Sequence, residues 1–382
     1  MAEDEIPTEP IDPNDPTTPS VDPDDQLTPP DGAAHRLGVP PWALVAAAAI
    51  VLGVTGYLVW PRSPAVQRGE PHVVAVSSAD ELRIKAEKGD ATAQLDLGDN
   101  YGAGNGVPRD PAEALKWYRK AAEQGLAKAQ VKLGWVYIGG LGTAKDPVEG
   151  ANWFRKAAQQ GSADAQYSLG VVYLKGVGVA KDPGEAVKWF RQAAEQGDPE
   201  AQFNLGWAYA TGQGVTSDPA EAATWYRKAA DQGDEGAQVK LGLDYASGTG
   251  VAKDPSEAVN WFRKAADQGD ASAQFNLGAA YAAGDGVAKD LAEAVKWFSK
   301  AAGQNDAGAQ YVLGLCYADG KGVPKDEKEA LAWFEVSAAS GNASAVESRD
   351  FLERQLGSQT TLAAKQRSKE LLKQIELNKP AP

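Results

Sequence analysis

A 36-residue pattern is repeated seven times in succession in this chain, and this repetition limits its possible folds more than any other feature. The first copy begins at Ala86, each later copy begins 36 residues after the one before, and the seventh ends at Ser337. A fixed period of this length is typical of stacked supersecondary units, because a single unit of this kind cannot bury its own apolar face. The pattern therefore predicts a solenoid.

The first half of each copy predicts a helix. Ala, Gln, Leu, Gly and Tyr recur there at helical spacing, as in Ala165, Gln166, Leu169, Gly170 and Tyr173, and form one apolar stripe. The Gly is unfavourable inside a helix by about 1 kcal/mol relative to Ala. Its presence in all seven copies predicts that the backbones of two helices approach each other at this residue.

The second half of each copy predicts another helix, which begins with a capping box and its preferred proline, as in Asp182, Pro183 and Glu185. Along this helix, Trp and a second aromatic residue recur on one face, as in Trp189 and Phe190. Burial of an aromatic side chain is favourable by about 1.5 to 3 kcal/mol before other costs. Seven tryptophans are therefore predicted to form the centre of the core: Trp117, Trp153, Trp189, Trp225, Trp261, Trp297 and Trp333.

The copies share the pattern A-x-x-G-x-x-x-A-Q-x-x-L-G-x-x-Y-x-x-G-x-G-V-x-x-D-P-x-E-A-x-x-W-F/Y-R-K-A, which resembles the Sel1-like repeat, a close relative of the tetratricopeptide repeat. The resemblance implies an all-α fold, a right-handed superhelical solenoid of helix-turn-helix repeats that binds or scaffolds other proteins. Family members include bacterial envelope and signalling adaptors. The cysteine-rich secreted members close each hairpin with a disulfide, which the single Cys316 of this chain cannot form.

Caps are predicted at both ends of the solenoid, which spans residues 78–337. Ser78 and Glu81 have the spacing of a capping box and predict a lone second helix before the first full copy. Residues 338–378 begin as an eighth copy and then depart from the pattern. Their leucines predict two further helices that cover the open end, as is expected of solenoids.

Three segments precede the solenoid. Residues 1–38 contain ten Asp and Glu, eight Pro and one Arg, a composition that cannot bury enough surface to offset chain entropy, so we expect disorder. Residues 39–61 include an uncharged run from Trp42 to Trp60, which as a helix would be about 28 Å long, close to the roughly 30 Å of bilayer hydrocarbon. Residues 62–77 predict a linker.

The uncharged run predicts one transmembrane helix with a tryptophan at each membrane interface. A cleavable signal is the weaker alternative, because the run is longer than an ordinary signal and follows a long acidic region. The nearby charges, Arg36 on one side and Arg62 and Arg68 on the other, do not fix the orientation. We expect a single-pass membrane protein with a periplasmic or extracytoplasmic solenoid, and a cytoplasmic solenoid is the alternative.

Several chemistries are not expected. The formal net charge of −14 offers no basic surface for a phosphate backbone, so nucleic acid is not an expected partner. His35 and His72 are the only histidines, too few for a catalytic triad or a metal cluster. The Gly176 and Gly178 pair follows a helix rather than a strand and predicts a turn, not a phosphate loop. We therefore expect no enzyme activity, no metal and no small-molecule cofactor.

A groove is predicted on the concave side of the superhelix. Alignment of the Leu-Gly-x-x-Tyr core with tetratricopeptide repeats places one face of each first helix there. The residue after the Gly varies among Asp, Trp, Val, Leu and Ala, so packing does not demand tryptophan, and Trp often anchors partners. The alternative is that these tryptophans fill gaps between copies. The predicted groove residues for an extended or helical peptide are Trp135, Trp207, Lys132, Tyr167, Phe203, Lys240 and Leu243.

The sequence as a whole favours a membrane-anchored scaffold or adaptor that binds a protein or peptide ligand. A structural spacer without a groove ligand is the first alternative, and a cell-envelope hydrolase is the last, because fold alone does not decide function.

The solenoid and the anchor should be separable. We expect residues 79–378 to be soluble and strongly helical on their own by far-ultraviolet circular dichroism, whereas the full chain should require detergent. Full-length protein in the soluble fraction of lysed cells would contradict the predicted anchor.

Overall fold

Residues 76–378 are described by the computed structural model, so that the predicted tail (1–38), membrane span (39–61) and most of the linker lie outside the described residues. The described residues form 17 helices and no strand. None of these helices combines the length and the apolar character that a bilayer span requires. The predicted all-α repeat architecture is confirmed for this part of the chain.

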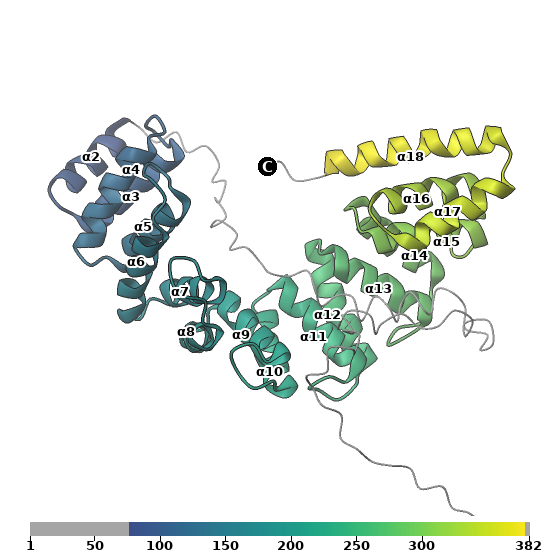
Figure 1. Ribbon diagram of the computed structural model, residues 1–382, viewed down its shortest axis with the longest axis horizontal. Helices are drawn as coiled ribbons and strands as arrows, with labels where there is room; N and C mark the ends of the chain where they lie inside the picture. The colour runs from purple at the N-terminus through teal and green to yellow at the C-terminus, as the bar shows by residue number, and fades with distance from the viewer. Residues whose placement is uncertain (1–75, 379–382) are drawn as a thin grey trace, which may run out of the picture.

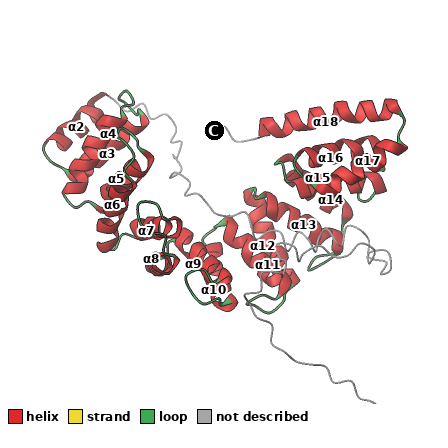
Figure 2. Cartoon of the chain, viewed as in Figure 1, coloured by secondary structure: helices red, strands yellow, loops and turns green. Residues whose placement is uncertain are grey.

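The helices stack in chain order into an open arc, with α2 (Val76–Glu87) near one end and α18 (Ser358–Asn378) at the other (Figure 1). Short loops join the helices (Figure 2). Repeats 1 to 7 each pair a first helix with a second helix. The first helices are α3 (Ala91–Ala103), α5 (Ala127–Gly139), α7 (Ala163–Lys175), α9 (Pro199–Thr211), α11 (Glu235–Ser247), α13 (Ala271–Ala283) and α15 (Ala307–Asp319). The second helices are α4 (Pro111–Glu123), α6 (Pro147–Gln159), α8 (Pro183–Glu195), α10 (Pro219–Asp231), α12 (Pro255–Gln268), α14 (Leu291–Gly303) and α16 (Glu327–Ala339).

Every second helix of repeats 1 to 7 begins at an aspartate N-cap, as predicted. The carboxylate of Asp182 accepts a hydrogen bond from the backbone N–H of Glu185 at 2.9 Å. The other half of the predicted capping box is different. The N–H of Asp182 donates to the carbonyl of Tyr173 at 2.9 Å, and the Glu185 carboxylate pairs with Lys188 at 2.8 Å. The N-cap therefore ties the second helix to the first helix of its hairpin, which a local capping box would not do.

The Gly inside each first helix is required mainly by an aromatic ring, and not by a second backbone as predicted. A Cβ atom on Gly170 would lie 2.6 Å from the ring of Phe190 and 3.2 Å from the nearest backbone atom, the carbonyl oxygen of Ala186. The Phe190 ring is 2% exposed. An equivalent contact with Phe or Tyr occurs in all seven repeats, at distances of 2.5 to 2.8 Å. This aromatic residue, which follows the tryptophan, fills the centre of each hairpin.

The seven tryptophans lie between hairpins rather than at their centres. Trp153 of repeat 2 belongs to a cluster with Tyr118 of repeat 1 and Leu133 of repeat 2. Trp225 of repeat 4 belongs to a cluster with Phe190 of repeat 3. Their predicted burial is confirmed except at Trp189, which is partly exposed. Their contribution is therefore to the stacking of one repeat on the next.

A buried glutamine in each first helix joins three helices. The side-chain amide of Gln202 in α9 donates to the carbonyl of Ala194 in α8 at 3.1 Å. Its oxygen accepts a hydrogen bond from Gln232, the residue after α10, at 2.8 Å. In repeat 7, Ser340 stands in place of the second glutamine, and the Oε1 atom of Gln310 has no hydrogen-bond partner among the described residues. The glutamines thus form a ladder along the stack that ends at repeat 7.

The N-terminal end is covered by a lone helix, α2, which begins at Val76, so that Ser78, the predicted N-cap, lies inside the helix. Helix α2 packs against α3, and Ala86 is 1% exposed. The carbonyl of Ala86 accepts a hydrogen bond from the side chain of Gln94 at 3.0 Å. Helix α2 therefore supplies the contact that a preceding repeat would make.

The two helices predicted after repeat 7 are present, but α18 packs along the side of the last repeat and not only over the open end. Helix α17 (Ala343–Gln355) follows α16 in the manner of a first helix, whereas α18 packs mainly against α16 and also reaches α14. Figure 1 shows α18 alongside α16 at the end of the arc. Arg367 of α18 forms an ion pair with Glu329 of α16 at 3.0 Å. One capping helix thus covers the side of the last repeat, and Phe351 of α17 remains 59% exposed.

The sequence of α16 is adapted to this cover. Ala332 and Val336 are fully buried in one cluster with Leu371 of α18. The equivalent residues of repeat 6 are Lys296 and Lys300, both exposed to solvent. Because two lysines could not be buried there without partners, the exchange for small and apolar residues accompanies the packing of α18.

The second glycine of each turn makes the closest contact between neighbouring repeats. At Gly178 the φ angle is +72°, and a Cβ atom there would lie 1.9 Å from the carbonyl oxygen of Pro147, the first residue of α6. Equivalent distances in repeats 2 to 7 are 1.9 to 2.2 Å. At Gly106 of repeat 1, φ is +71° and a Cβ would meet no atom within 4 Å. Gly178 and Gly106 thus share a conformation but not a neighbour.

This difference provides a test of the contact. The substitution Gly106→Ala should destabilise the fold by about 1 to 2 kcal/mol, because it meets only the left-handed backbone penalty. The substitution Gly178→Ala should cost about 1 to 3 kcal/mol more, because it also forces two repeats apart. Urea unfolding of both variants measures the difference, and equal losses would contradict the proposed role of the contact.

Candidate protein-binding groove

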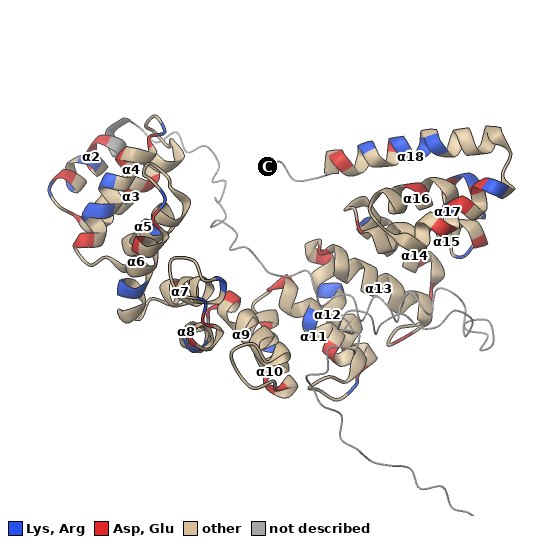
Figure 3. Ribbon diagram, viewed as in Figure 1, with Lys and Arg blue, Asp and Glu red and all other residues tan. Residues whose placement is uncertain are grey.

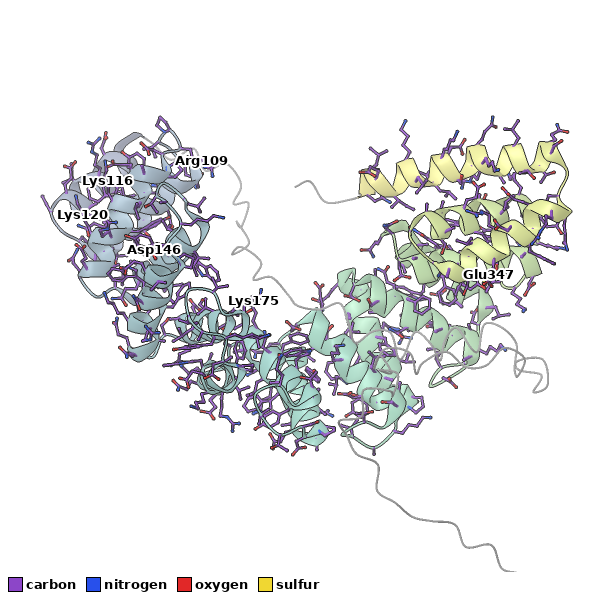
Figure 4. The ribbon with its side chains drawn as sticks, viewed as in Figure 1. Arg109, Lys116, Lys120, Asp146, Lys175 and Glu347 are labelled. Atoms are coloured by element: carbon purple, nitrogen blue, oxygen red, sulfur yellow. The ribbon has the colours of Figure 1, made fainter. Side chains whose placement is uncertain are left out.

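One face of each first helix lies toward the inside of the arc. On α7 this face contains Ser168, Val171 and Lys175, since residues three and four apart share a helical face. Figure 4 shows Lys175 on the side of α7 that faces the opening of the arc, whereas Lys116 and Lys120 of α4 lie on the outer side. The first helices therefore line the inside, and the second helices cover the outside.

Two tryptophans occupy this inner face, both half-buried. Trp135 of repeat 2 makes an edge contact with Phe154, with ring centroids 5.0 Å apart. Trp207 of repeat 4 packs against two clusters, one that contains Val171 of repeat 3 and one that contains Tyr226 of repeat 4. Each ring thus has one side anchored in the core, and part of each remains accessible to a partner.

Two further predicted groove residues are buried. Tyr167 is 5% exposed and Phe203 is 4% exposed. The Tyr167 ring lies 5.9 Å from that of Phe190, and the Phe203 ring lies 5.7 Å from that of Tyr226. Burial and the nearby Glu200 raise the pKa of the Tyr167 phenol above its usual value. These two rings leave little surface for a ligand and contribute mainly to packing.

Lys132 is engaged with its neighbours at the step from repeat 1 to repeat 2. Its Nζ atom lies 3.0 Å from the carboxylate of Asp99 on the preceding first helix. The same carboxylate accepts a hydrogen bond from the hydroxyl of Tyr118 at 2.7 Å. Asp99 and Lys132 on this part of the inner face therefore neutralise each other's charge.

The step from repeat 4 to repeat 5 differs from this arrangement. Lys240, Leu243 and Asp244 share one face of α11 and are all half-buried. Burial raises the pKa of the Asp244 carboxyl from 3.8 to about 7, and the positive charge of Lys240 offsets this only in part. Burial likewise lowers the pKa of Lys240. The pair thus lies in a poorly hydrated place where each charge is disfavoured.

Asp244 was not among the predicted groove residues. The equivalent position is apolar in five other repeats, where it holds Val136, Val172, Ala208, Ala280 and Cys316. A carboxylate at a position that holds an apolar residue in five other repeats is the signal in the sequence that distinguishes Asp244.

Basic and acidic residues are interspersed over the described helices (Figure 3). Within residues 76–378, no group of three His, Cys, Asp or Glu side chains could hold a metal ion. The Cys316 thiol is half-buried, and burial raises its pKa to about 11. A thiol of this kind is protonated at neutral pH and is a poor nucleophile.

A stack of hairpins with an accessible inner face defines a helical-repeat protein of the tetratricopeptide-like class. Sel1 repeats match residues 91–126, 127–162, 163–198, 199–234, 236–270, 271–306 and 307–342. The chain therefore belongs to the Sel1 repeat family, with the predicted period and with each unit counted from the start of its first helix. Sel1 and tetratricopeptide-like repeat proteins generally mediate protein–protein interactions and are typically not enzymes.

Two solved bacterial structures are similar to this chain. A Sel1 repeat protein from Oxalobacter formigenes is 38% identical, with a TM-score of 0.61, over 72% of this chain and 80% of that one. A protective antigen of uropathogenic Escherichia coli strains, described as displaying an SLR fold, is 34% identical, with a TM-score of 0.51, over 80% of this chain and 75% of that one. No curated protein matches the chain significantly in sequence.

Asp244 should lower the stability of the fold in a pH-dependent way. Its folded pKa of about 7 lies above the ordinary value of 3.8, so the folded state binds the proton more tightly and stability falls as pH rises between these two values. The substitution Asp244→Ala should therefore stabilise the protein by on the order of 2 kcal/mol above pH 7, allowing for water at the half-buried group, and by little near pH 4.

Urea unfolding at pH 4 and pH 8 measures this effect. The control is Asp99→Ala, which removes a carboxylate that accepts hydrogen bonds and should destabilise the protein at pH 8. A gain at Asp244→Ala that is the same at both pH values would contradict the assignment.

Proposed function

We propose that this protein is a membrane-anchored scaffold that binds a protein or peptide on the inner face of repeats 2 to 5. The observation that carries the proposal is the pair of half-buried tryptophans, Trp135 and Trp207, on that face. Buried parts of each ring fix its position, and the accessible parts offer a rigid apolar surface that costs little entropy to engage. Aromatic side chains of this kind dominate the energetics of many interfaces.

The other repeats support this assignment. The equivalent positions of repeats 3, 5 and 6 hold Val171, Leu243 and Ala279, and their hairpins stack in the same way. Tryptophan is therefore not required there for stacking. Leu243 of repeat 5 follows the two tryptophans in repeat order and is half-buried like them, whereas Val171 of repeat 3 is buried and offers little surface. The two tryptophans and Leu243 are the apolar contacts that support an extended or helical segment as the ligand.

The anchor is the second part of the proposal and rests on the sequence. The uncharged run in residues 39–61, with a tryptophan at each end, has the length of a bilayer span. A scaffold anchored there would hold its partner close to the membrane. We favour an extracytoplasmic solenoid, because long domains are translocated largely regardless of their charge.

The double substitution Trp135→Ala and Trp207→Ala tests the groove. The purified full chain, in detergent where needed, should lose the partner that it captures from solubilised membranes of its own cells, because both anchors are removed. Thermal unfolding should fall less than for Trp261→Ala, which removes a tryptophan that is 3% exposed and should cost about 3 to 5 kcal/mol.

Trp261→Ala also serves as the matched control for capture, since it should retain the partner at temperatures where it is folded. Unchanged capture by the double variant would contradict the proposed groove, and so would a loss of stability as large as that of Trp261→Ala.

A further inference from the structure

Five of the seven core tryptophans are covered by a lysine of the same helix. In repeats 1, 2, 4, 5 and 6, the lysine three residues after the tryptophan places its Nζ atom 3.6 to 4.0 Å from the centroid of the indole ring. An ammonium group in this place is attracted by the electron-rich face of the ring. Figure 4 shows one of these lysines, Lys120, on the outer side of the arc. The five lysines are Lys120, Lys156, Lys228, Lys264 and Lys300.

Repeat 7 covers its tryptophan in a different way. Trp333 lies in one cluster with Leu371 and Ile375 of α18. Val336 stands where the five other repeats have lysine, and it is fully buried in the same cluster. The tryptophan of repeat 7 is therefore covered by an apolar helix and not by a cation.

Within the described residues, repeat 3 has neither of these covers. Gln192 stands at the lysine position, and its side-chain oxygen accepts a hydrogen bond from the amide of Gln166 in α7 at 3.3 Å. Trp189 is partly exposed, whereas the other six tryptophans are 3 to 9% exposed. The ring of Trp189 therefore lacks the ammonium group that its equivalents have.

A carboxylate near this ring lacks the same lysine. Glu195 is exposed and follows Gln192 by three residues. In repeats 1, 4 and 5, an acidic residue follows the covering lysine at this spacing, at which opposite charges on a helix attract each other. The outer face of repeat 3 has thus kept the ring and the acid of this arrangement without its cation.

The residues beside Trp189 favour a cation over an apolar helix as its cover. Repeat 7 has Ala332 and Val336 at the positions that Lys188 and Gln192 occupy in repeat 3. The side chain of Lys188 is 71% exposed and pairs with Glu185 at 2.8 Å. A helix packed on repeat 3 as α18 packs on repeat 7 would bury these polar side chains at a cost, whereas a single lysine would leave them in solvent.

We propose that the outer face of repeat 3 is a docking site for a protein partner, and that a lysine side chain of this partner lies over the ring of Trp189, near Glu195. The partner's lysine takes the place that the chain's own lysine has in five other repeats. This site does not depend on the proposed groove, because the second helices cover the opposite side of the arc. A scaffold with a site on each side can hold two proteins together.

Displayed random peptides test the proposal when they are selected on the full chain and those that also bind the Gln192→Lys variant are removed. In this variant the chain supplies the lysine itself, so the site is filled. The remaining peptides should share a lysine. Replacement of that lysine by norleucine, which removes the charged group, should weaken binding to the original chain about threefold to thirtyfold, as expected for the loss of a cation from an indole ring.

Three controls make the outcome specific. Thr224→Lys adds the same charge to the outer face of repeat 4, where repeats 1, 3 and 6 already have lysine, and should leave the affinity of the peptides unchanged. The double variant Trp135→Ala and Trp207→Ala should also bind them as the original chain does, because they occupy a site outside the groove. Gln192→Lys should unfold at the same temperature as the original chain or at a higher one, because lysine fits over the equivalent rings.

Three results would overturn the proposal. A selection without any peptide sensitive to Gln192→Lys would show that there is no docking site at Trp189. Norleucine peptides that bind as tightly as the lysine peptides would show that the occupant is apolar. A lower unfolding temperature of Gln192→Lys would show that lysine does not fit over Trp189 as it does in the other repeats.

Discussion

The glutamine ladder is the interaction on which the regular stacking of this protein depends. Each buried glutamine holds the end of one second helix, the start of the next first helix and the end of its own second helix in a single hydrogen-bonded set, as Gln202 does with Ala194 and Gln232. A buried amide without partners costs about 1 to 3 kcal/mol, so any shift between repeats would break two hydrogen bonds at once. The ladder therefore fixes both the register of each hairpin and the angle between neighbours.

The buried contacts of each first helix lie on the same side as the glutamine ladder. The residues on its inner face can therefore differ from repeat to repeat. Three contacts hold the hairpins together, and they lie away from the inner face or at the ends of the helices. They are the packing of an aromatic ring against the helix glycine, the hydrogen bond of the N-cap aspartate to Tyr173 or its equivalent, and the contact of the turn glycine with the preceding repeat. The side chains at Trp135, Val171, Trp207 and Leu243 can thus differ in size without a change in the stack. Asp244 of repeat 5 stands where five other repeats have an apolar residue, and burial raises the pKa of its carboxyl.

Features set by neighbouring residues could be predicted from the sequence. The aspartate caps of the second helices follow from signals within a few residues, and the structure has them where they were expected, whereas α2 begins at Val76 and not after a cap at Ser78. The ladder could not be predicted in this way, because Gln94 and its partner Gln124 are 30 residues apart and glutamine at an apolar spacing suggests only the edge of a stripe. Phe190 fills the centre of its hairpin, whereas the tryptophan before it was predicted there. The two residues are adjacent and both aromatic, so the sequence does not show which of them faces its own hairpin.

The packing of α18 against α16 has a consequence for how long such a protein can become. Ala332 and Val336 pack in one cluster with α18, and position 340 has no glutamine to continue the ladder from Gln310. Repeat 7 therefore has residues suited to the last place in the array and not to a place inside it. Duplication of a 36-residue segment is compatible with the interior of the array, because neighbouring repeats there are joined by the same contacts at every step. A copy inserted after α16 would bury lysines or displace α18. The arc and its inner face can therefore become longer only by duplication of repeats inside the array.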